Sequence, residues 1–334
     1  MIDLAGERNV PEDVVRRMAR AIVHRGPDEE GFLWRPGVGL ASRRLSIVGL
    51  ADGQQPMSNE ERNVHVVFNG ELFDHIEKRK ALQQNGHILT THCDTEIIPH
   101  LWEDHQEGMF EKLRGQFAIA LWDESKRQLT LGRDRFGIAP IFWSRQGDWL
   151  LFASEVKALL ASGMVPRRPD LRGIDHVFTF AALPGPITCF EGVQMLPPAH
   201  FLQIRPANRG DAASIQERAY WKMDFPDAGQ EVDGDAKSLV DRFEQVMLRA
   251  VDLRLRADVP VGSYLSGGVD SSMILALACH LHGKNVHTYT IRVDEPELDE
   301  LDAASMVARH IGAPPPIVQE FRTEDALSTY PSLI

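Results

Sequence analysis

The sequence Ser263-Tyr-Leu-Ser-Gly-Gly-Val-Asp-Ser-Ser272 predicts a strand, a tight turn and a helix in direct succession. An apolar run over 259–265 precedes the glycine pair, and a helix-like run over 273–280 follows it. Adjacent glycines let the backbone reach positive φ and approach a ligand closely. A turn that leads into a helix N-terminus also directs backbone N–H groups at an anion. Three hydroxyls and a carboxylate in this turn therefore indicate a phosphate site. The Gly-Lys-Ser/Thr ending of a Walker loop is absent, and an ordinary ligand-free turn is the alternative.

Composition places the chain among acidic globular proteins. It has 36 Lys and Arg against 48 Asp and Glu, a net charge of −12, and 43% hydrophobic residues. This balance disfavours nucleic acid and anionic membranes as partners. No apolar run reaches the roughly 18 residues of a membrane span. A sparse, odd set of cysteines (Cys93, Cys189 and Cys279) and no signal-peptide pattern predict a cytoplasmic protein without structural zinc. A chain of 334 residues should hold two domains.

The first half of the chain combines many short strands with a few helices. Apolar residues recur at helical spacing in 11–23, and further helices are expected at 78–84 and after Ser154. Strand-like runs are expected at 38–48, 64–68, 116–122, 128–133, 141–143 and 150–153. This pattern favours a layered α+β domain over a parallel, doubly wound one.

Polar residues stand beside these strands, where a ligand site could form. Arg44 interrupts a strand-like run and needs a carboxylate or phosphate partner, because an unpaired buried charge is costly. Asn69-Gly-Glu71 is expected to form a turn that presents a side-chain amide and a backbone N–H to one ligand. Asp94 is expected to cap the helix that follows it. The plain alternatives are a surface ion pair for Arg44, a strand-end turn for Asn69 and Gly70, and a helix cap alone for Asp94.

Five short motifs in this half together resemble the glutaminase domain of class II, Ntn-type amidotransferases. In chain order they are His24-Arg-Gly-Pro-Asp28, Arg44-Leu-Ser-Ile47, Asn69-Gly-Glu71, Cys93-Asp-Thr-Glu96 and Arg133-Asp-Arg-Phe-Gly137. The later Ser266–Ser272 stretch resembles the PP-loop, Ser-Gly-Gly-x-Asp-Ser-Ser, of ATP pyrophosphatases. In this order the motifs resemble the glutamine-hydrolysing asparagine synthetase family of the bacterial B type, from about Asp3 to the end of the chain.

The resemblance implies a fold and a division of the chain. Residues 1–205 would form an αββα Ntn-hydrolase-type domain that lacks its first strand, and residues 206–235 would be a linker. Residues 236–334 would form the first part of an α/β PP-loop domain.

The resemblance also implies the roles of individual residues. The Asn69 side chain and the Gly70 N–H would form an oxyanion hole, and Arg44 would pair with the α-carboxylate of glutamine. Glu71 and Asp94 would hold the glutamine α-amino group. The implied ATP site comprises Leu265, Ser266, Gly267, Gly268, Asp270, Ser271, Ser272, Thr290 and Ile291.

Within the implied ATP site, Leu265 and the Thr290–Ile291 pair would line the adenine pocket. The loop serines and Asp270 would hold pyrophosphate and Mg²⁺, which spreads charge while aspartate is activated as β-aspartyl-AMP. The expected reaction is the ATP-dependent amidation of aspartate with ammonia from glutamine, giving asparagine, glutamate, AMP and pyrophosphate. A homodimer is left open.

The nucleophile of the family is a cysteine that becomes the mature N-terminal residue, with its own α-amine as base. No such segment precedes Ile2-Asp-Leu-Ala5 in this sequence. We interpret Cys93 as a small, partly buried thiol, so the chain as written is expected not to hydrolyse glutamine. A late start, a fragment and a real loss of glutaminase activity are the explanations left open.

The acceptor is open as well. The family's second acidic glycine motif and its aspartate-binding residues are not found before Ile334. The chain alone is therefore expected to be poorly active, with an uncovered sheet face and edge. One alternative is a related amidotransferase that acts on another carboxylate, as β-lactam synthetases and capsule- or exosortase-linked enzymes do. The other is a non-catalytic remnant that binds only nucleotide or glutamine.

Overall fold

The computed structural model describes residues 1–208, 211–322, 324–325 and 327–329. The chain divides into two compact units, unit 1 over Met1–Asp224 and unit 2 over Phe225–Ile334. The segment expected to be a linker, residues 206–235, contributes to both. Its strand β12 (Ser214–Ala219) pairs with β11 (His200–Arg205) inside unit 1, so the boundary lies later in the chain than residue 205.

Unit 1 is built on two six-stranded antiparallel sheets. The first sheet has the order β10-β8-β9-β1-β3-β2, with the bounds Gln194–Met195, Phe142–Gln146, Trp149–Ala153, Ile2–Asp3, Val38–Arg44 and Glu29–Arg35. The second sheet has the order β12-β11-β7-β6-β5-β4. Its last four strands span Gln128–Arg133, Gly115–Asp123, Val64–Leu72 and Met57–Ser58.

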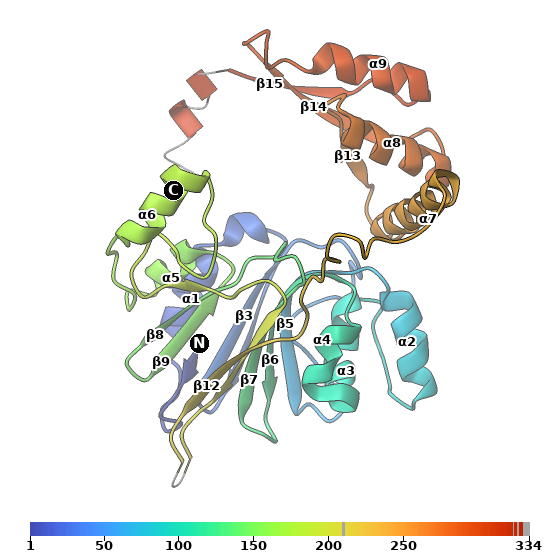
Figure 1. The fold of residues 1–334 in the computed structure, drawn as a ribbon. Coiled ribbons are helices and arrows are strands. Elements are labelled where there is room, and N and C mark those ends of the chain that lie inside the picture. The colour runs from blue at the N-terminus through green and yellow to red at the C-terminus, as the bar shows by residue number, and fades with distance from the viewer. Residues whose placement is uncertain (209–210, 323, 326, 330–334) are drawn as a thin grey trace. The chain divides into compact units, whose positions relative to one another are not determined.

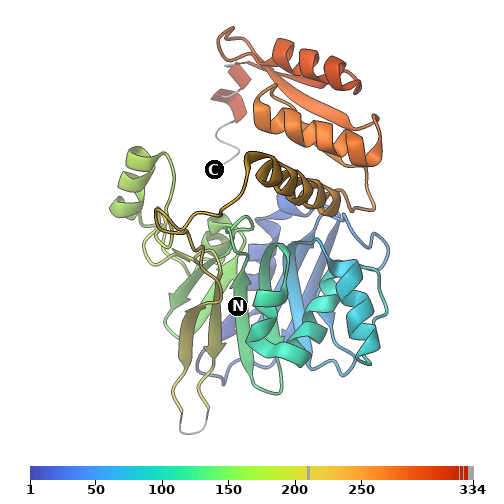
Figure 2. The same ribbon diagram turned by 45° about the vertical axis from the view of Figure 1, so that its right-hand side comes forward.

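Helices cover the outer face of each sheet, which confirms the expected αββα layering (Figure 1). Helices α1 (Glu12–Arg20) and α5 (Val156–Ala161) pack on the first sheet. Helices α2 (His75–Gln84), α3 (Ile97–His105) and α4 (Met109–Lys112) pack on the second and face the viewer in Figure 2. A third apolar core lies between the two sheets. The remaining helical segments are η1 (Val23–Arg25), η2 (Asp94–Glu96), η3 (Gln106–Gly108) and α6 (Leu171–Phe180).

Strand β6 shows how the sequence specifies these layers. Its odd-numbered residues Phe117, Ile119 and Leu121 belong to the core beneath the helices, whereas Ala118 and Ala120 belong to the core between the sheets. Successive side chains of a strand point to opposite faces. Both faces of β6 are therefore buried, which explains its nearly continuous apolar run.

Strand β5 does not end at Phe68. It continues through Leu72, because strand β6 pairs with every residue from Val64 to Leu72. The prediction of a turn at Asn69-Gly-Glu71 is therefore wrong, because these residues belong to the last part of strand β5, which ends at Leu72. Their side chains and N–H groups consequently have the fixed directions of an extended backbone.

Unit 2 contains a parallel three-stranded sheet in the order β13 (Gly262–Tyr264), β14 (His287–Val293) and β15 (Ile317–Phe321). Helix α8 (Val269–His282) connects the first two strands and α9 (Leu301–Ile311) connects the last two, which confirms the expected strand–helix–strand unit. Leu265 and Leu275 are among the residues buried in its core.

One face of this sheet carries exposed apolar side chains. Tyr264, Tyr289 and Ile317 are in register and therefore share a face, and they are 83%, 45% and 48% exposed. Thr288 and Thr290, which point to the other face, are buried. The expectation of an uncovered sheet face thus agrees with the described part of unit 2.

Helix α7 (Ala236–Arg254) differs from its sequence pattern. Its sequence places Phe243, Val246, Met247 and Ala250 on one apolar face, which predicts that this face is buried. In the structure Phe243 and Val246 are 56% and 59% exposed, and the buried residues are Val251 and Leu253. Within unit 2 this helix packs mainly against α8, and only its C-terminal end contributes to the apolar core. Among the described residues, no helix has the length and apolarity needed to cross a bilayer.

Candidate functional site

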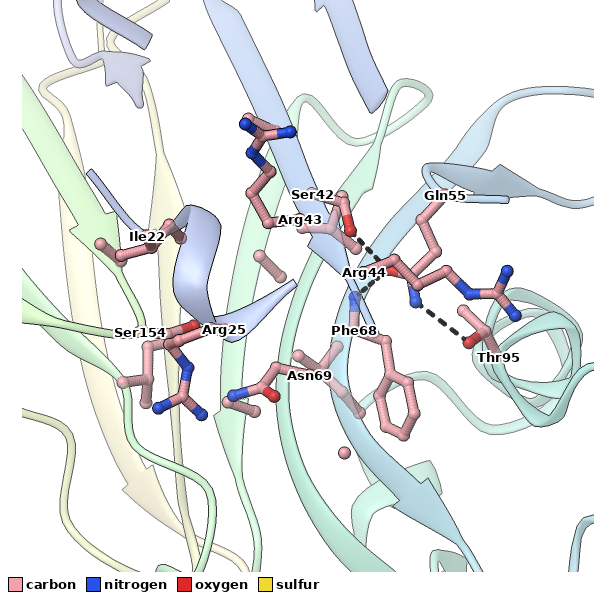
Figure 3. Close-up of a pocket in the computed structure, with 18 of the residues that line it drawn as sticks. Ile22, Arg25, Ser42, Arg43, Arg44, Gln55, Phe68, Asn69, Thr95 and Ser154 are labelled. Atoms are coloured by element: carbon pink, nitrogen blue, oxygen red, sulfur yellow. Dashed lines mark hydrogen bonds between the residues drawn. The ribbon is translucent and has the colours of Figure 1, made fainter. Parts of the chain in front are cut away.

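A cavity of about 340 Å³ opens in unit 1 beside the last part of β5. Figure 3 shows Asn69 near its centre, with Arg25 and Ser154 on one side and Gln55 and Thr95 on the other. Residues from β3, β5 and η2, far apart in the sequence, share this lining. All five residues that the resemblance assigned to glutamine line the cavity: Arg44, Asn69, Gly70, Glu71 and Asp94.

The Asn69 amide is a donor without an acceptor. Its Nδ2 atom is buried and has no hydrogen-bond partner within the described residues. A buried polar group left unpaired costs about 1–3 kcal/mol. Because this group faces a cavity, a ligand oxygen is the natural acceptor.

The backbone N–H of Gly70 points toward the same open edge of β5. The N–H of Phe68 donates to Gln55 Oε1, and the N–H of Leu72 donates to Asp94 Oδ2, each at 2.8 Å and on the side away from β6. Alternate residues of an antiparallel strand direct their N–H groups the same way. The Gly70 N–H therefore also points away from β6, and it has no acceptor in the part of the chain that the structure describes.

Position 70 requires glycine. Its φ is +155°, and a Cβ atom built there would lie 2.0 Å from the backbone oxygen of Gln116. Any larger residue would push β5 away from β6 at the point where the two donors are held. Glycine is thus required here because it lets β5 lie close to β6 and keeps the Gly70 N–H in place, and not because it forms a flexible turn.

Asp94 is buried at the floor of the cavity and does not cap α3. Helix α3 begins at Ile97, after η2, whereas the Asp94 carboxylate accepts the N–H of Leu72 on β5. The expected helix cap is therefore wrong. Burial raises the pKa of the Asp94 carboxyl above its ordinary value, so a cationic ligand group would stabilise its charged form.

Cys93 lies beside this carboxylate but is not activated. Its thiol is buried and contacts Asp94 Oδ1 and Thr95 Oγ1, each at 3.4 Å. Burial, with a smaller contribution from the Asp94 charge, raises the pKa of Cys93 to about 11. A thiol that stays protonated is a poor nucleophile.

Arg44 already has a carboxylate partner. Its guanidinium is buried, and Nη1 donates to Glu29 Oε2 at 2.9 Å. Nη2 donates to the carbonyls of Val48 and Gly49 at 2.9 and 2.8 Å. Three of the five N–H donors of this side chain are thus used within the protein. The prediction that Arg44 has a carboxylate partner is confirmed by its hydrogen bond to Glu29.

The phosphate-type loop of unit 2 has the predicted form. Gly267 has φ +81°, and a Cβ atom there would lie 2.6 Å from the Cβ of Ala303 on α9. The 14-residue helix α8 begins at Val269, so its free N–H groups face the loop. Within the loop the hydroxyls of Ser266 and Ser271 lie 3.0 Å apart, and Ser272 Oγ donates to the carbonyl of Gly268 at 2.7 Å.

The other residues assigned to the ATP site lie around this loop on different surfaces. Leu265 is buried, and its N–H donates to the carbonyl of Tyr289 at 2.9 Å. Thr290 is buried beneath the helices, whereas Ile291 points to the uncovered face of the sheet and is 54% exposed. Asp270 is exposed in the first turn of α8, where the helix dipole favours a carboxylate even without a ligand.

Two cavity residues were missed in the sequence. Gln55 connects β5 to η2, because its Oε1 accepts the N–H of Phe68 and its Nε2 donates to Thr95 Oγ1 at 3.3 Å (Figure 3). Arg25 lines the cavity and pairs with Glu155 at 3.2 Å. Arg25 belongs to the His24–Asp28 motif, which could have indicated it. Gln55 stands in no motif, because its role depends on contacts distant in sequence.

The αββα layering of unit 1 defines a domain of the Ntn-hydrolase type, and among the described residues the Asn69 amide at the edge of β5 has no acceptor. Residues 1–221 match the family model described as "Glutamine amidotransferase domain". The chain therefore belongs to the glutamine amidotransferase family. Residues 242–334 match the family model described as "Asparagine synthase".

Curated relatives match most of this chain. Asparagine synthetase [glutamine-hydrolyzing] 1 of Bacillus subtilis (strain 168) is 34% identical over 301 residues, covering 90% of this chain and 46% of the relative. Amidase chry2 of Gibberella zeae is 36% identical over 263 residues, covering 78% of this chain and 38% of the relative. The chain thus spans less than half the length of either relative.

Among solved structures, the glutamine phosphoribosylpyrophosphate amidotransferase from B. subtilis in complex with ADP and GMP aligns with a TM-score of 0.49 and 15% identity. The alignment covers 96% of this chain and 90% of that chain.

Proposed function

We propose that this chain provides the glutamine site and the ATP loop of an enzyme that transfers the amide nitrogen of glutamine to a carboxylate, with aspartate as acceptor. Glutamine, ATP and aspartate are the implied substrates. The names of the asparagine synthetase relatives and the match of residues 242–334 support this choice of reaction.

The observation that carries the proposal is a pair of donors at the cavity wall, Asn69 Nδ2 and the Gly70 N–H, which have no acceptor among the described residues. An amide carbonyl needs such a pair when its oxygen takes up negative charge. The buried Asp94 carboxylate supplies the opposite end of the site, where an α-ammonium group would be held. Arg44, held by Glu29, keeps two N–H donors for the α-carboxylate.

The loop at Ser266–Ser272 supports the nucleotide half of the proposal. Its backbone N–H groups and hydroxyls suit the phosphates of ATP, and the exposed Ile291 would border the base. The side chains of Leu265 and Thr290 are buried and do not share that surface. The donor set fits Mg²⁺, because Asp270 and the serines offer hard oxygen ligands and no nitrogen or sulfur. When bound, the ion would neutralise phosphate charge. The chain's own N–H groups would orient the phosphates toward the acceptor carboxylate.

The proposal separates glutamine binding from glutamine hydrolysis. Cys93 has a protonated, buried thiol, and neither Cys189 nor Cys279 lines the cavity. We therefore expect this chain to bind L-glutamine and to release no glutamate. Ammonia would then have to be supplied directly in an assay of the nucleotide half.

Calorimetric titration of the full chain with L-glutamine tests the binding site. We expect saturable binding that Asp94→Asn weakens at least about tenfold, because a buried charge partner is lost. Glu77→Gln, on the surface of α2, is the matched control. Equal affinity in the wild type and Asp94→Asn, or no preference for L- over D-glutamine, would count against the proposed site.

The amidase-named relatives favour a second candidate, in which the acceptor carboxylate is not aspartate. Exchange of radiolabelled pyrophosphate into ATP distinguishes the candidates. Aspartate-dependent exchange supports asparagine formation, and exchange that needs another carboxylate supports the alternative. Binding of ATP without any exchange, across a panel of carboxylates, would indicate a chain that only holds nucleotide.

A further inference from the structure

Outside the cavity described above, four side chains of unit 1 lie close together beside helix α3. Glu60 lies in the loop between β4 and β5, His87 follows α2, and His100 and Glu103 stand on α3. Each offers one ligand atom, and these atoms all lie within 4.8 Å of one another. We infer that this cluster binds a zinc ion that has a structural role.

The distances between the ligand atoms match a tetrahedral ion. His100 Nδ1 lies 3.2 Å from Glu60 Oε2 and 3.3 Å from Glu103 Oε2. His87 Nδ1 lies 3.7 Å from Glu103 Oε2, and the ligand atoms of the remaining pairs lie within 4.8 Å of one another. Zinc bonds of about 2.0–2.2 Å in tetrahedral geometry set neighbouring ligand atoms about 3.3–3.6 Å apart. The cluster therefore needs only small side-chain adjustments to close around an ion.

The directions of the buried atoms also indicate a shared centre. The His100 side chain is 1% exposed, and its Nδ1 has no hydrogen-bond partner among the residues that the structure describes, although two carboxylate oxygens are near. Within the same residues, the buried Glu103 Oε2 also has no hydrogen-bond partner. Around a metal ion, each lone pair points at the ion and not at the neighbouring ligand atom. Ligand atoms that lie close together without forming hydrogen bonds to one another are therefore what a metal site requires.

Surrounding groups orient these ligands in the way typical of zinc sites. His87 Nε2 lies 3.0 Å from Asp104 Oδ1. Because an ionised carboxylate only accepts, Nε2 donates in this contact, and Nδ1 of the neutral imidazole would present its lone pair to the cluster. Asn59 Nδ2 donates to Glu103 Oε1 at 2.7 Å, and the N–H of Ile88 donates to Glu60 Oε1 at 2.6 Å. The second oxygen of each glutamate is directed at the cluster.

The ligand set selects the kind of metal. Two imidazoles with two carboxylates suit zinc, whereas magnesium and calcium prefer oxygen ligands alone. The expectation of no structural zinc came from the cysteines, and this cluster uses none. An ion here would connect the β4–β5 loop, the end of α2 and helix α3. Helices α2 and α3 lie on the outer face of the second sheet (Figure 1).

Zinc content of the full chain tests the inference. The protein is stripped with a chelator, loaded with Zn²⁺, dialysed and measured by mass spectrometry of the metal. We expect one tightly held zinc per chain and a higher unfolding temperature in its presence. Competition with a colorimetric chelator gives the affinity, and Mg²⁺ in large excess should not displace the ion.

Two partly exposed ligands provide variants that should still fold. Glu60→Gln and His87→Gln are each expected to weaken zinc binding at least about tenfold, since even the loss of an orienting partner costs about 10–100-fold. His105→Asn, at the exposed end of the same helix, is the matched control and should bind zinc as the wild type does. Circular dichroism without metal verifies that all three variants are folded.

Cobalt gives a second readout that does not depend on stability. Co²⁺ bound by this cluster should show the intense visible absorption of a tetrahedral ion, and Glu60→Gln and His87→Gln should abolish it. Loss of tight zinc from the wild type on dialysis would overturn the inference. So would zinc or cobalt binding that is the same in the wild type, Glu60→Gln and His87→Gln, because the ion would then lie elsewhere.

Discussion

The two units of this chain cover their sheets to different extents. In unit 1, helices cover one face of β6 and the first sheet covers the other, and Ile119 is fully buried. In unit 2, helices cover one face of the sheet, and Tyr264 and Ile291 remain 83% and 54% exposed on the other. Apolar burial is the main favourable term in folding. We therefore expect unit 1 to be the more stable unit by itself, because both faces of its sheet strands are buried. The stability of unit 2 should depend more on contacts to its open sheet face.

The largest expected effect is a loss of stability in unit 1 alone, caused by Asp134→Ala. The Asp134 carboxylate accepts four backbone N–H groups, from Phe117, Phe136, Ile138 and Ala139, at 2.9–3.1 Å. Asp134→Ala leaves these four donors unpaired, and those of Phe117 and Ala139 are buried, so it should lower the free energy of unfolding of unit 1 by about 4 kcal/mol. Calorimetry should show the unit 1 transition moving to lower temperature.

The control for this variant lies in unit 2. Asp294→Ala removes an exposed carboxylate and should leave both transitions in place. If Asp134→Ala shifted the unit 2 transition by the same amount, the two units would be one cooperative structure and the contrast between them would fail.

A smaller effect is expected in unit 2 from Gly267→Ala. The left-handed φ of +81° and the close approach of Ala303 both oppose a side chain at this position. The variant should lower the stability of unit 2 by about 1–3 kcal/mol and abolish ATP binding. Fluorescence titration with ATP, compared with Gly283→Ala, measures the loss.

Gly283 is an informative comparison. It also has a positive φ, +86°, but open space surrounds the position of its Cβ. Its substitution should cost only the backbone strain and leave ATP binding intact. Equal loss of ATP binding in both variants would show that general destabilisation, and not the loop geometry, is responsible.

The pH dependence of unit 1 should change moderately in Asp94→Asn. Burial raises the pKa of the Asp94 carboxyl in the folded state. The folded state then binds this proton more tightly than the unfolded state, so stability falls as pH rises from the ordinary carboxyl pKa through the raised one. A tenfold difference in proton affinity corresponds to about 1.4 kcal/mol.

Urea unfolding at pH values from 5 to 8 measures this slope. Asp94→Asn should flatten it, and at pH 8 the variant should be at least as stable as the wild type. L-Glutamine should reduce the slope of the wild type, because its ammonium group stabilises the ionised carboxylate. A wild-type stability that rises over this range and is unchanged in Asp94→Asn would contradict the assigned direction.

The smallest expected effect concerns the open face of unit 2. Ile291→Thr should change the stability of unit 2 by less than about 0.5 kcal/mol, because the side chain is already largely in water. It should also reduce self-association, since an exposed apolar patch favours it. Light scattering at increasing protein concentration measures the second effect.

The matched variant in unit 1 is Ile119→Thr, which makes the same change at a fully buried strand position. It should cost about 2–3 kcal/mol. Similar costs at the two positions would mean that the open face is covered in solution.

Much of unit 1 was predictable because local patterns agree with the final structure. The apolar run of β6 and the periodic face of α1 both indicate elements that are present. Motifs such as Asn69-Gly-Glu71 and Cys93-Asp-Thr-Glu96 were recognisable individually, and the fold brings them into one cavity.

The errors arose where a distant contact decides the local structure. Asn69 to Glu71 carry turn-forming residues, yet pairing with β6 keeps them in a strand. Asp94 has the residue type of a helix cap, yet its carboxylate accepts from Leu72 on another element. The Glu60, His87, His100 and Glu103 cluster has no sequence spacing of its own, because three separate segments assemble it.

The arrangement of Phe68, Gly70 and Leu72 also makes one backbone proton distinctive. The flanking N–H groups are held by Gln55 and Asp94, whereas the Gly70 N–H meets only the cavity. Its hydrogen should exchange with deuterium faster than its neighbours in the same strand. A ligand oxygen bound there would slow that exchange, so the Gly70 amide resonance can report site occupancy in a single nuclear magnetic resonance spectrum.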